Sequence, residues 1–274
     1  MSGALSFDFM PDTVREAAEL LWRHRCAGSV LQTLPPALRP TSHAQGHAIQ
    51  AQLPAVAGQR VAGWKIAATS SAGQAHINVG GPLAGRILRS FVVEDGAALS
   101  LAGNRMRVAE PEFAFRMGRE LPPRARPYSV PEVLDAVATL HPAFEIPDSR
   151  FAEFTRAGEA QLIADDACCG PFAFGPAAPE HWRQIDLSAH RVHGSVSNAE
   201  GVRLSREGDG RAALGDPRGA LTWLVNELSS LGIALEAGQY VSTGTCMVPM
   251  AIAPGDRAQA DFGVLGRVSL AFRA

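Results

Sequence analysis

The segment 107–117 has the two-residue period of a β-strand and limits what this chain can fold into. One face of the predicted strand carries carboxylates and the other carries aromatic and small apolar side chains. A strand of this kind needs a hydrophobic core on one side and a polar site on the other. The two faces hold Val108, Glu110, Glu112 and Ala114, and Ala109, Pro111, Phe113 and Phe115, respectively.

Helical and extended patterns elsewhere do not alternate regularly along the chain. Capping-box spacings, Thr13 with Glu16 and Ser129 with Glu132, begin two of the predicted helices. Residues 31–54 are expected to be a loop leading into a short helix, and residues 70–100 loops with short strands. The predicted helices cover 13–28, 47–53, 130–140 and 216–232; the predicted strands cover 61–68, 107–117, 143–147, 258–262 and 268–272.

The order of these elements predicts the fold class. Without regular alternation of strand and helix, a doubly wound or barrel α/β fold is disfavoured, and an α+β fold with a mixed β-roll core is expected. We expect an N-terminal helical segment at 1–60 and a metal-binding catalytic β-roll domain at 61–274, joined as one continuous domain.

Charge and hydropathy exclude several classes of function. The formal net charge is −2, so no basic surface for nucleic acid is expected. No stretch approaches the roughly 20 apolar residues that span a bilayer, and the first twelve residues lack the pattern of a signal peptide. We therefore expect a cytoplasmic protein that binds neither nucleic acid nor membrane. The four cysteines form no CxxC pair and are expected to be buried thiols.

The carboxylates of the acidic strand are candidate metal ligands. Glu110 and Glu112 should have Cβ atoms about 6–7 Å apart on one face. Glu145, between Phe144 and Ile146, presents a similar apolar setting. Carboxylates in such a setting need a compensating cation, and Mg²⁺ or Mn²⁺ prefers oxygen ligands. A solvated strand face is the alternative.

Lys65 is the second candidate, because it interrupts the apolar run Gly63-Trp64-Lys65-Ile66-Ala67. It is either a surface lysine whose stem covers apolar neighbours or an amine for proton transfer or for pairing with a substrate carboxylate.

Five stretches in this order resemble the 2-keto-4-pentenoate hydratase/2-oxo-3-hexenedioate decarboxylase branch of the fumarylacetoacetate hydrolase family. The resemblance covers about four-fifths of the chain. It rests on the order and spacing of the stretches together, since a bare ExE pair is common in unrelated proteins. They are GWKIAATS at 63–70, EPEFAF at 110–115, PAFEIPDSR at 142–150, IADDACCG at 163–170 and VSTGTCMVPMAIAPGD at 241–256.

The resemblance implies roles for individual residues. Glu110, Glu112 and Glu145 would ligate Mg²⁺ or Mn²⁺, and Lys65 would be the active-site lysine. Asp165, Thr243 and Gly244 would line the substrate site. Asp148 and Arg150 match a family signature, with a local structural ion pair as the alternative.

Three positions depart from the family pattern. Leu83 stands where many hydratases have an aspartate, which removes a candidate acid/base group. Ala67 replaces a glycine, and Asp166 replaces the asparagine of an Asp-Asn pair. These changes suggest a pocket retuned for a different, less polar substrate.

The resemblance implies a divalent-metal-dependent hydratase (lyase) of 2-hydroxy-2,4-dienoates in aromatic catabolism. Decarboxylation of a 2-oxo-3-enedioate is the first alternative, and Leu83 favours it. A diketo-acid carbon–carbon hydrolase would require a histidine with an acidic partner over the metal, and an inactive partner subunit would not turn over substrate. Family members are typically homo-oligomers, and a complex with a related pathway enzyme is also implied.

Overall fold

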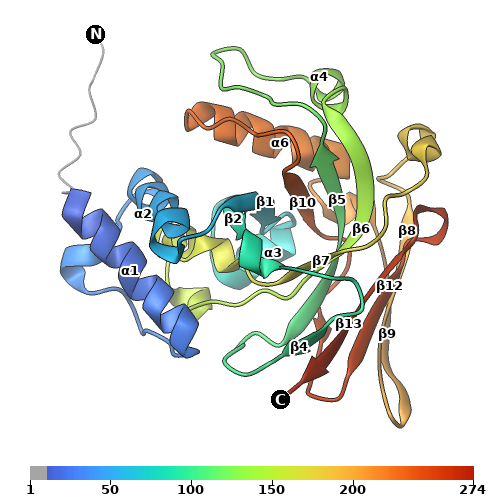
Figure 1. The fold of residues 1–274 in the computed structure, drawn as a ribbon, viewed down its shortest axis with the longest axis horizontal. Helices are drawn as coiled ribbons and strands as arrows, with labels where there is room; N and C mark the ends of the chain where they lie inside the picture. Colours follow the sequence, from blue (N-terminus) through green and yellow to red (C-terminus); the bar gives the residue numbers. More distant parts are fainter. Residues whose placement is uncertain (1–10) are drawn as a thin grey trace.

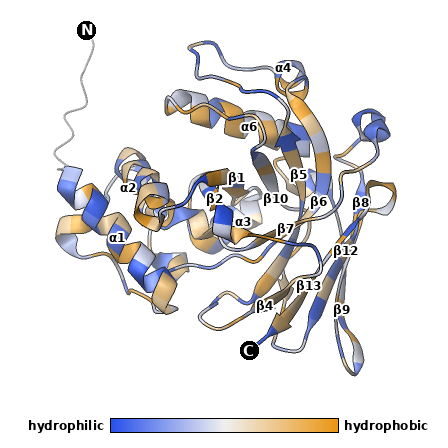
Figure 2. Ribbon diagram, viewed as in Figure 1, coloured by the Kyte–Doolittle hydropathy of each residue, from blue (hydrophilic) through white to orange (hydrophobic). Residues whose placement is uncertain are grey.

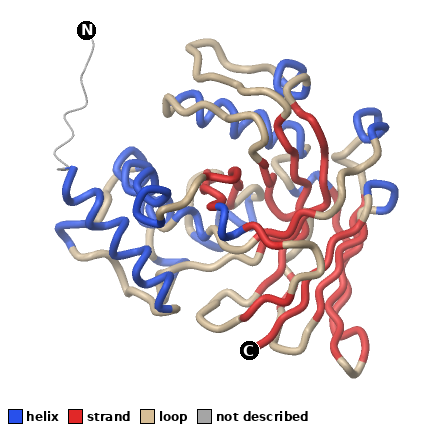
Figure 3. The backbone as a smooth tube through the Cα atoms, in the orientation of Figure 1, coloured by secondary structure: helices blue, strands red, loops and turns tan. Residues whose placement is uncertain are grey.

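Two β-sheets and a group of helices make up the fold, shown in Figure 1 as a computed structural model that describes residues 11–274. The N-terminal helices gather at one end of the molecule, the smaller sheet lies at the other, and two later helices lie at the top of the view (Figure 3). This segregation confirms the predicted α+β class. The proposed division at residue 60 stays a prediction.

The larger sheet is mixed and carries the acidic strand at its centre. Its strands follow the order β2-β1-β10-β5-β6-β7-β3, with β11 paired to β5. All pairs along this order are antiparallel except β1 with β10 and β3 with β7. The bounds are β1 Val61–Ala67, β2 Leu83–Leu88, β3 Val92–Val93, β5 Val108–Met117, β6 Val137–Glu145, β7 Phe172–Phe174, β10 Tyr240–Thr245 and β11 Met250–Ala251.

The smaller sheet has the order β4-β13-β12-β8-β9 and packs against the larger one through a shared hydrophobic core. Phe113 of β5 meets Phe262 edge-to-face, with ring centroids 5.0 Å apart. The predicted C-terminal hairpin is confirmed as β12 paired with β13. The bounds are β4 Ala98–Ser100, β8 Arg191–Asn198, β9 Gly201–Asp209, β12 Arg257–Asp261 and β13 Arg267–Arg273.

The helices form a second core with the edge of the larger sheet. Along α1, hydrophilic and hydrophobic residues recur (Figure 2), and its apolar positions join a core that also holds residues of α2 and α5. None of the helices among the described residues is long and apolar enough to cross a bilayer. The bounds are α1 Pro11–Ala27, α2 His43–Ala57, α3 Ser71–Ile77, α4 Val130–Leu134, α5 Glu159–Ala164 and α6 Pro217–Ser230.

Several predicted elements have different bounds. Helix α1 already includes Pro11, so Thr13 lies inside it instead of capping it. The short helix predicted at 47–53 is present but longer, because Ser42 caps α2 and the helix continues through Pro54 to Ala57. Residues 70–100 contain short strands as expected, β2 among them, and also the unpredicted helix α3.

The predicted helix at 130–140 is wrong beyond Leu134. The Ser129–Glu132 capping box starts α4 as expected, but Val137 already begins β6. Strand β6 pairs with β5 along nearly its whole length, so its backbone groups form hydrogen bonds to β5 that a longer α4 would prevent. Asp216, in contrast, caps α6 as predicted by accepting a hydrogen bond from Arg218 N.

Candidate metal centre and active site

The register between β5 and β6 brings the three glutamates together. Glu110 lies directly opposite Glu145, and Glu112 follows two residues later on the same face of β5. One carboxylate oxygen from each residue lies within 4.8 Å of those of the other two. This spacing allows all three carboxylates to reach one ion.

Backbone and side-chain donors on β10 fix the position of Glu112. Its Oε2 accepts hydrogen bonds from Ser242 Oγ at 2.5 Å and from Gly244 N at 2.9 Å. Its Oε1 is buried and has no hydrogen-bond partner. A buried carboxylate oxygen without a donor is costly, and a cation would remove that cost.

Burial and mutual repulsion raise the pKa values of the carboxyl groups. Burial, with Glu145 nearby, raises the pKa of Glu110 to about 8. Burial and the charges of Glu145 and Glu110 raise the pKa of Glu112 well above its ordinary value. Burial also raises the pKa of Glu145, against the opposing effect of Lys65. The cluster is therefore poised to exchange protons for a metal ion.

Lys65 enters the same site from β1. Its side chain is 2% exposed, its Nζ lies 3.1 Å from Glu145 Oε1, and it donates a hydrogen bond to Ala167 O at 2.8 Å. Burial disfavours the charged amine, but Glu145 and Glu110 outweigh burial and raise the pKa of Lys65 above its ordinary value. Lys65 is thus a buried, protonated amine, and not the surface lysine that was the alternative.

The residues present fit a divalent cation. Three carboxylates face a single ammonium group, so a charge of +2 brings the formal charge of the cluster to neutrality. The donors are all carboxylate oxygens, as Mg²⁺ or Mn²⁺ prefers.

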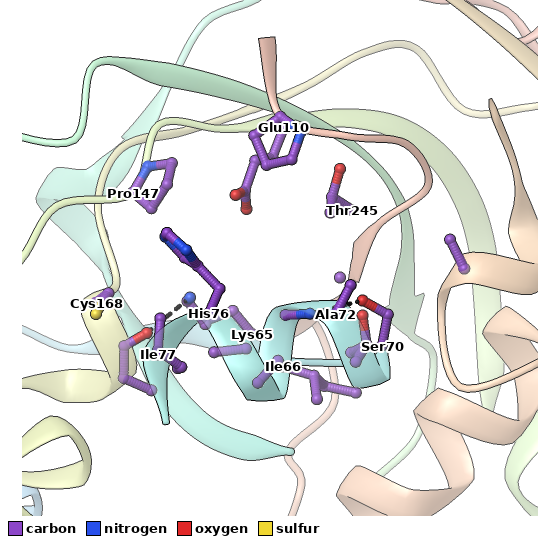
Figure 4. Close-up of a pocket in the computed structure, with 18 of the residues that line it drawn as sticks. Lys65, Ile66, Ser70, Ala72, His76, Ile77, Glu110, Pro147, Cys168 and Thr245 are labelled. Atoms are coloured by element: carbon purple, nitrogen blue, oxygen red, sulfur yellow. Dashed lines mark hydrogen bonds between the residues drawn. The ribbon is translucent and has the colours of Figure 1, made fainter. Parts of the chain in front are cut away.

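A cavity of about 570 Å³ opens over this cluster. Lys65 and Glu110 lie on its walls, and α3 contributes the facing wall (Figure 4). Most of the remaining lining is apolar, including Ile77, Met106 and Met247. The cavity therefore combines one charged end with an apolar interior, the usual composition of a site for a small organic acid.

A strained backbone segment presents the carbonyl that holds Lys65. Asp166, Ala167 and Cys168 all have positive φ, of 60°, 53° and 59°. Such conformations cost of order 1 kcal/mol or more each in residues with a Cβ. Gly85 allows the segment to approach β2, because a Cβ there would lie 2.5 Å from Asp166 O.

The other residues predicted for the substrate site divide into two groups. Gly244 lines the cavity, at φ 92°, where a Cβ would lie 2.3 Å from Thr69 Oγ1. Thr243 is buried beside it and donates to Phe113 O. Asp165 points elsewhere, accepting hydrogen bonds from Ser149 Oγ and Arg150 N, and is not among the lining residues.

Asp148, Arg150 and Leu83 were also singled out from the sequence and lie outside the lining. Asp148 and Arg150 form a close ion pair, and Asp148 also accepts a hydrogen bond from Arg105 N. This geometry matches the structural alternative for the pair. Leu83 is 3% exposed and packs in the helical core.

Several lining residues were not singled out from the sequence. Thr69, Ser70 and His76 reach the cavity from α3 and the turn before it. The sequence does contain residues typical of helix ends. Ser70 caps α3 by accepting a hydrogen bond from Gly73 N, and Asn78 ends the helix with φ 55°. A seven-residue helix leaves too few apolar repeats to detect by period.

The fold and the carboxylate cluster together define a class, an α+β enzyme with a site suited to a divalent cation. No protein-family model matches the chain. It is 33% identical over 217 residues to 2-hydroxyhexa-2,4-dienoate hydratase of Comamonas testosteroni, covering 78% of this chain and 79% of the relative. It is 31% identical to 4-oxalocrotonate decarboxylase of a Pseudomonas species, covering 77% and 78%.

Among solved structures, 4-oxalocrotonate decarboxylase from Pseudomonas putida G7, complexed with magnesium and adipate, has the same fold. The TM-score is 0.83 at 23% identity, covering 96% of this chain and 98% of that one. The chain belongs to the 2-keto-4-pentenoate hydratase/2-oxo-3-hexenedioate decarboxylase branch of the fumarylacetoacetate hydrolase family, as its sequence stretches predict.

Proposed function

We propose that the protein is a divalent-metal-dependent hydratase of 2-hydroxy-2,4-dienoates. The observation that carries this proposal is the convergence of three carboxylates, two of them buried, and Lys65 at one end of an apolar cavity. The relationship to a dienoate hydratase supports it. Glu110, Glu112 and Glu145 would hold the metal, and Lys65 would face the acid end of the substrate.

A bound metal would supply positive charge where negative charge develops on the 2-oxo oxygen during the reaction. Lys65, protonated and held between Glu145 and Ala167 O, would pair with the substrate carboxylate. Thr69 and Thr245 border the same cavity and offer hydroxyl groups. The apolar lining would exclude water from the conjugated chain.

The cation, assembly and location are further parts of the proposal. Mg²⁺ is favoured by the all-oxygen donor set and by the magnesium in the related solved structure, and Mn²⁺ by the donor set alone. A homo-oligomer, a complex with a related pathway enzyme and a cytoplasmic location follow from the family resemblance. Sedimentation of the purified protein, alone and with that enzyme, tests the assembly.

Decarboxylation of a 2-oxo-3-enedioate is the second candidate. Leu83 favours it, because an apolar residue replaces the carboxylate expected in a hydratase, and decarboxylation needs no group to activate water. The relationship to 4-oxalocrotonate decarboxylase supports the same alternative.

The test is turnover of 2-hydroxypenta-2,4-dienoate and of 2-oxo-3-hexenedioate, with and without Mg²⁺, followed by dienol absorbance and CO₂ release. We expect metal-dependent loss of the dienoate. Persistence of the dienoate together with CO₂ release from the second substrate would replace hydration with decarboxylation.

The Glu112→Ala variant should lose metal-dependent turnover by at least about 100-fold, because it removes a ligand and leaves Ser242 and Gly244 N without their acceptor. Glu236→Ala, at an exposed glutamate, is the matched control. Full activity of Glu112→Ala would show that the ligand assignment is wrong.

A further inference from the structure

His76 is an unpaired imidazole in the active-site cavity. It lies in the last turn of α3, and its ring projects from that helix into the space bordered by Glu110 and Pro147 (Figure 4). Its ring nitrogens have no hydrogen bond or ion pair to any residue of 11–274. Both nitrogens are therefore available to a bound molecule.

Packing sets the orientation of the ring without occupying its polar atoms. Phe154 meets His76 edge-to-face, with ring centroids 5.9 Å apart. Ser70 caps the start of α3, and Gln74 Nε2 donates to Ala68 O, which ties the helix to the end of β1. A cap and an aromatic contact thus hold the imidazole over the cavity.

The other ionisable groups that line the cavity are committed or unsuited to proton transfer. Glu110 belongs to the carboxylate cluster, and Lys65 is held by Glu145 and Ala167 O. Burial raises the pKa of Cys168 to about 12, so this thiol stays protonated. Leu83 has no ionisable group. His76 is the one free acid/base side chain among the described residues of the lining.

We propose that His76 is the acid/base catalytic residue for C4 and C5 of the substrate. This inference rests on the proposed hydratase function. With the carboxylate and C2 oxygen held at Glu110 and Lys65, the conjugated chain would extend along the apolar lining past His76. C4 and C5 would then lie nearest the imidazole.

In the first step, the His76 imidazolium would donate a proton to C5. The C2 hydroxyl releases its proton to water, its O–H electrons form the C2 carbonyl, and the remaining double bond lies between C3 and C4. In the second step, the neutral imidazole takes a proton from water as the oxygen bonds to C4. Electrons move through C3 to the C2 oxygen, and C3 then accepts a proton from solvent. His76 ends protonated, and one water has been added.

The experiment compares the wild type with His76→Gln, His76→Ala and the control His181→Gln, which changes an exposed histidine outside the cavity. Turnover of 2-hydroxyhexa-2,4-dienoate in D₂O with Mg²⁺ is followed by rate and by the configuration of deuterium at C5. For both His76 variants we expect kcat to fall about 100-fold with KM changed less than about threefold. Mg²⁺-dependent oxalate binding should be retained.

The stereochemistry separates catalysis from packing. Wild-type and control product should carry deuterium on one face of C5, whereas product from the variants should be deuterated on both faces by solvent. Added imidazole should restore part of the rate to His76→Ala. Unchanged kcat, or higher KM with single-face deuteration, would overturn the role of His76. A wild type that leaves the dienoate unchanged would overturn the hydratase function, and this inference with it.

Discussion

At the scale of single residues, Glu112 and Glu110 play different parts in the carboxylate cluster. Glu112 is 1% exposed and is fixed through one oxygen by Ser242 and Gly244, with the other oxygen left for a cation. Glu110 reaches the cavity, where a substrate would meet it. The Glu112 carboxylate is pre-positioned by the fold, so little ordering would be needed when an ion binds.

The raised pKa values predict how Mg²⁺ affinity depends on pH. The pKa of Glu110 is about 8 and that of Glu112 is raised as well, so below pH 8 a binding cation must displace protons. As pH decreases below 8, the Mg²⁺ affinity should fall by up to about tenfold per pH unit for each proton that binding releases. Calorimetric titration from pH 6 to 9, in buffers of different ionisation enthalpy, measures both the affinity and the protons released. An affinity independent of pH would contradict the assignment.

The stability of the metal-free protein should depend on pH in the direction opposite to that of the Mg²⁺ affinity. Carboxyl groups whose pKa is higher in the folded state than in the unfolded state bind more protons when folded, so the free energy of unfolding should decrease as pH rises from about 4.5 toward 8. Mg²⁺ should restore stability at the alkaline end by binding the ionised carboxylates. Melting curves with and without Mg²⁺ across this range test both signs.

The sequence predicts the acidic residues well because their proximity is largely local. Glu110 and Glu112 share a face through the period of one strand, and the pattern around Glu145 suggested a similar strand. Long-range register alone decides that Glu145 lies opposite Glu110. The direction of Asp165, toward Ser149 and Arg150, depends on tertiary contacts that no local pattern contains.

At the scale of elements, the wrong helix end predicted from the sequence results from competition between local helix propensity and strand pairing. Ser129 and Glu132 specify a helix start, and nothing within 130–140 marks its early end. The pairing of β6 with β5 converts residues 137–140 to strand. Helix α3 was not predicted because its seven residues are too few to establish a helical period.

The short helix α3 should respond to the loss of its cap. Ser70→Ala removes the acceptor for Gly73 N and should cost about 1 kcal/mol of local stability. Because α3 forms a wall of the cavity, amide exchange should speed up in 71–77 and turnover should fall. Ser42→Ala removes the equivalent cap of α2, away from the cavity, and is the matched control. Equal effects of both variants on turnover would show that α3 has no special role.

At the scale of the whole molecule, the helical layer and the larger sheet are joined by a buried polar link. Gln50 of α2 donates to Ala84 O of β2 at 2.8 Å and to Ile163 O of α5 at 3.0 Å, and accepts from Arg86. The Arg86 guanidinium also lies over the Trp64 ring of β1, 4.6 Å from its centroid. Three elements, α2, β2 and α5, therefore meet at the Gln50 side chain, and Arg86 extends the link to β1.

This link predicts that residues 11–60 unfold together with the sheet. Gln50→Ala would remove the hydrogen bonds that join the Arg86 guanidinium and two buried carbonyls to one side chain, which should lower the free energy of unfolding by about 2–4 kcal/mol. Gln59→Ala removes only an exposed hydrogen bond from Ser90 N and should cost less than about 1 kcal/mol. Denaturant unfolding followed by tryptophan fluorescence and by amide exchange should show one transition, shifted strongly only in Gln50→Ala. Separate transitions for α1–α2 and for the sheet would instead make the helical segment an independent domain, against the continuous domain expected from the sequence.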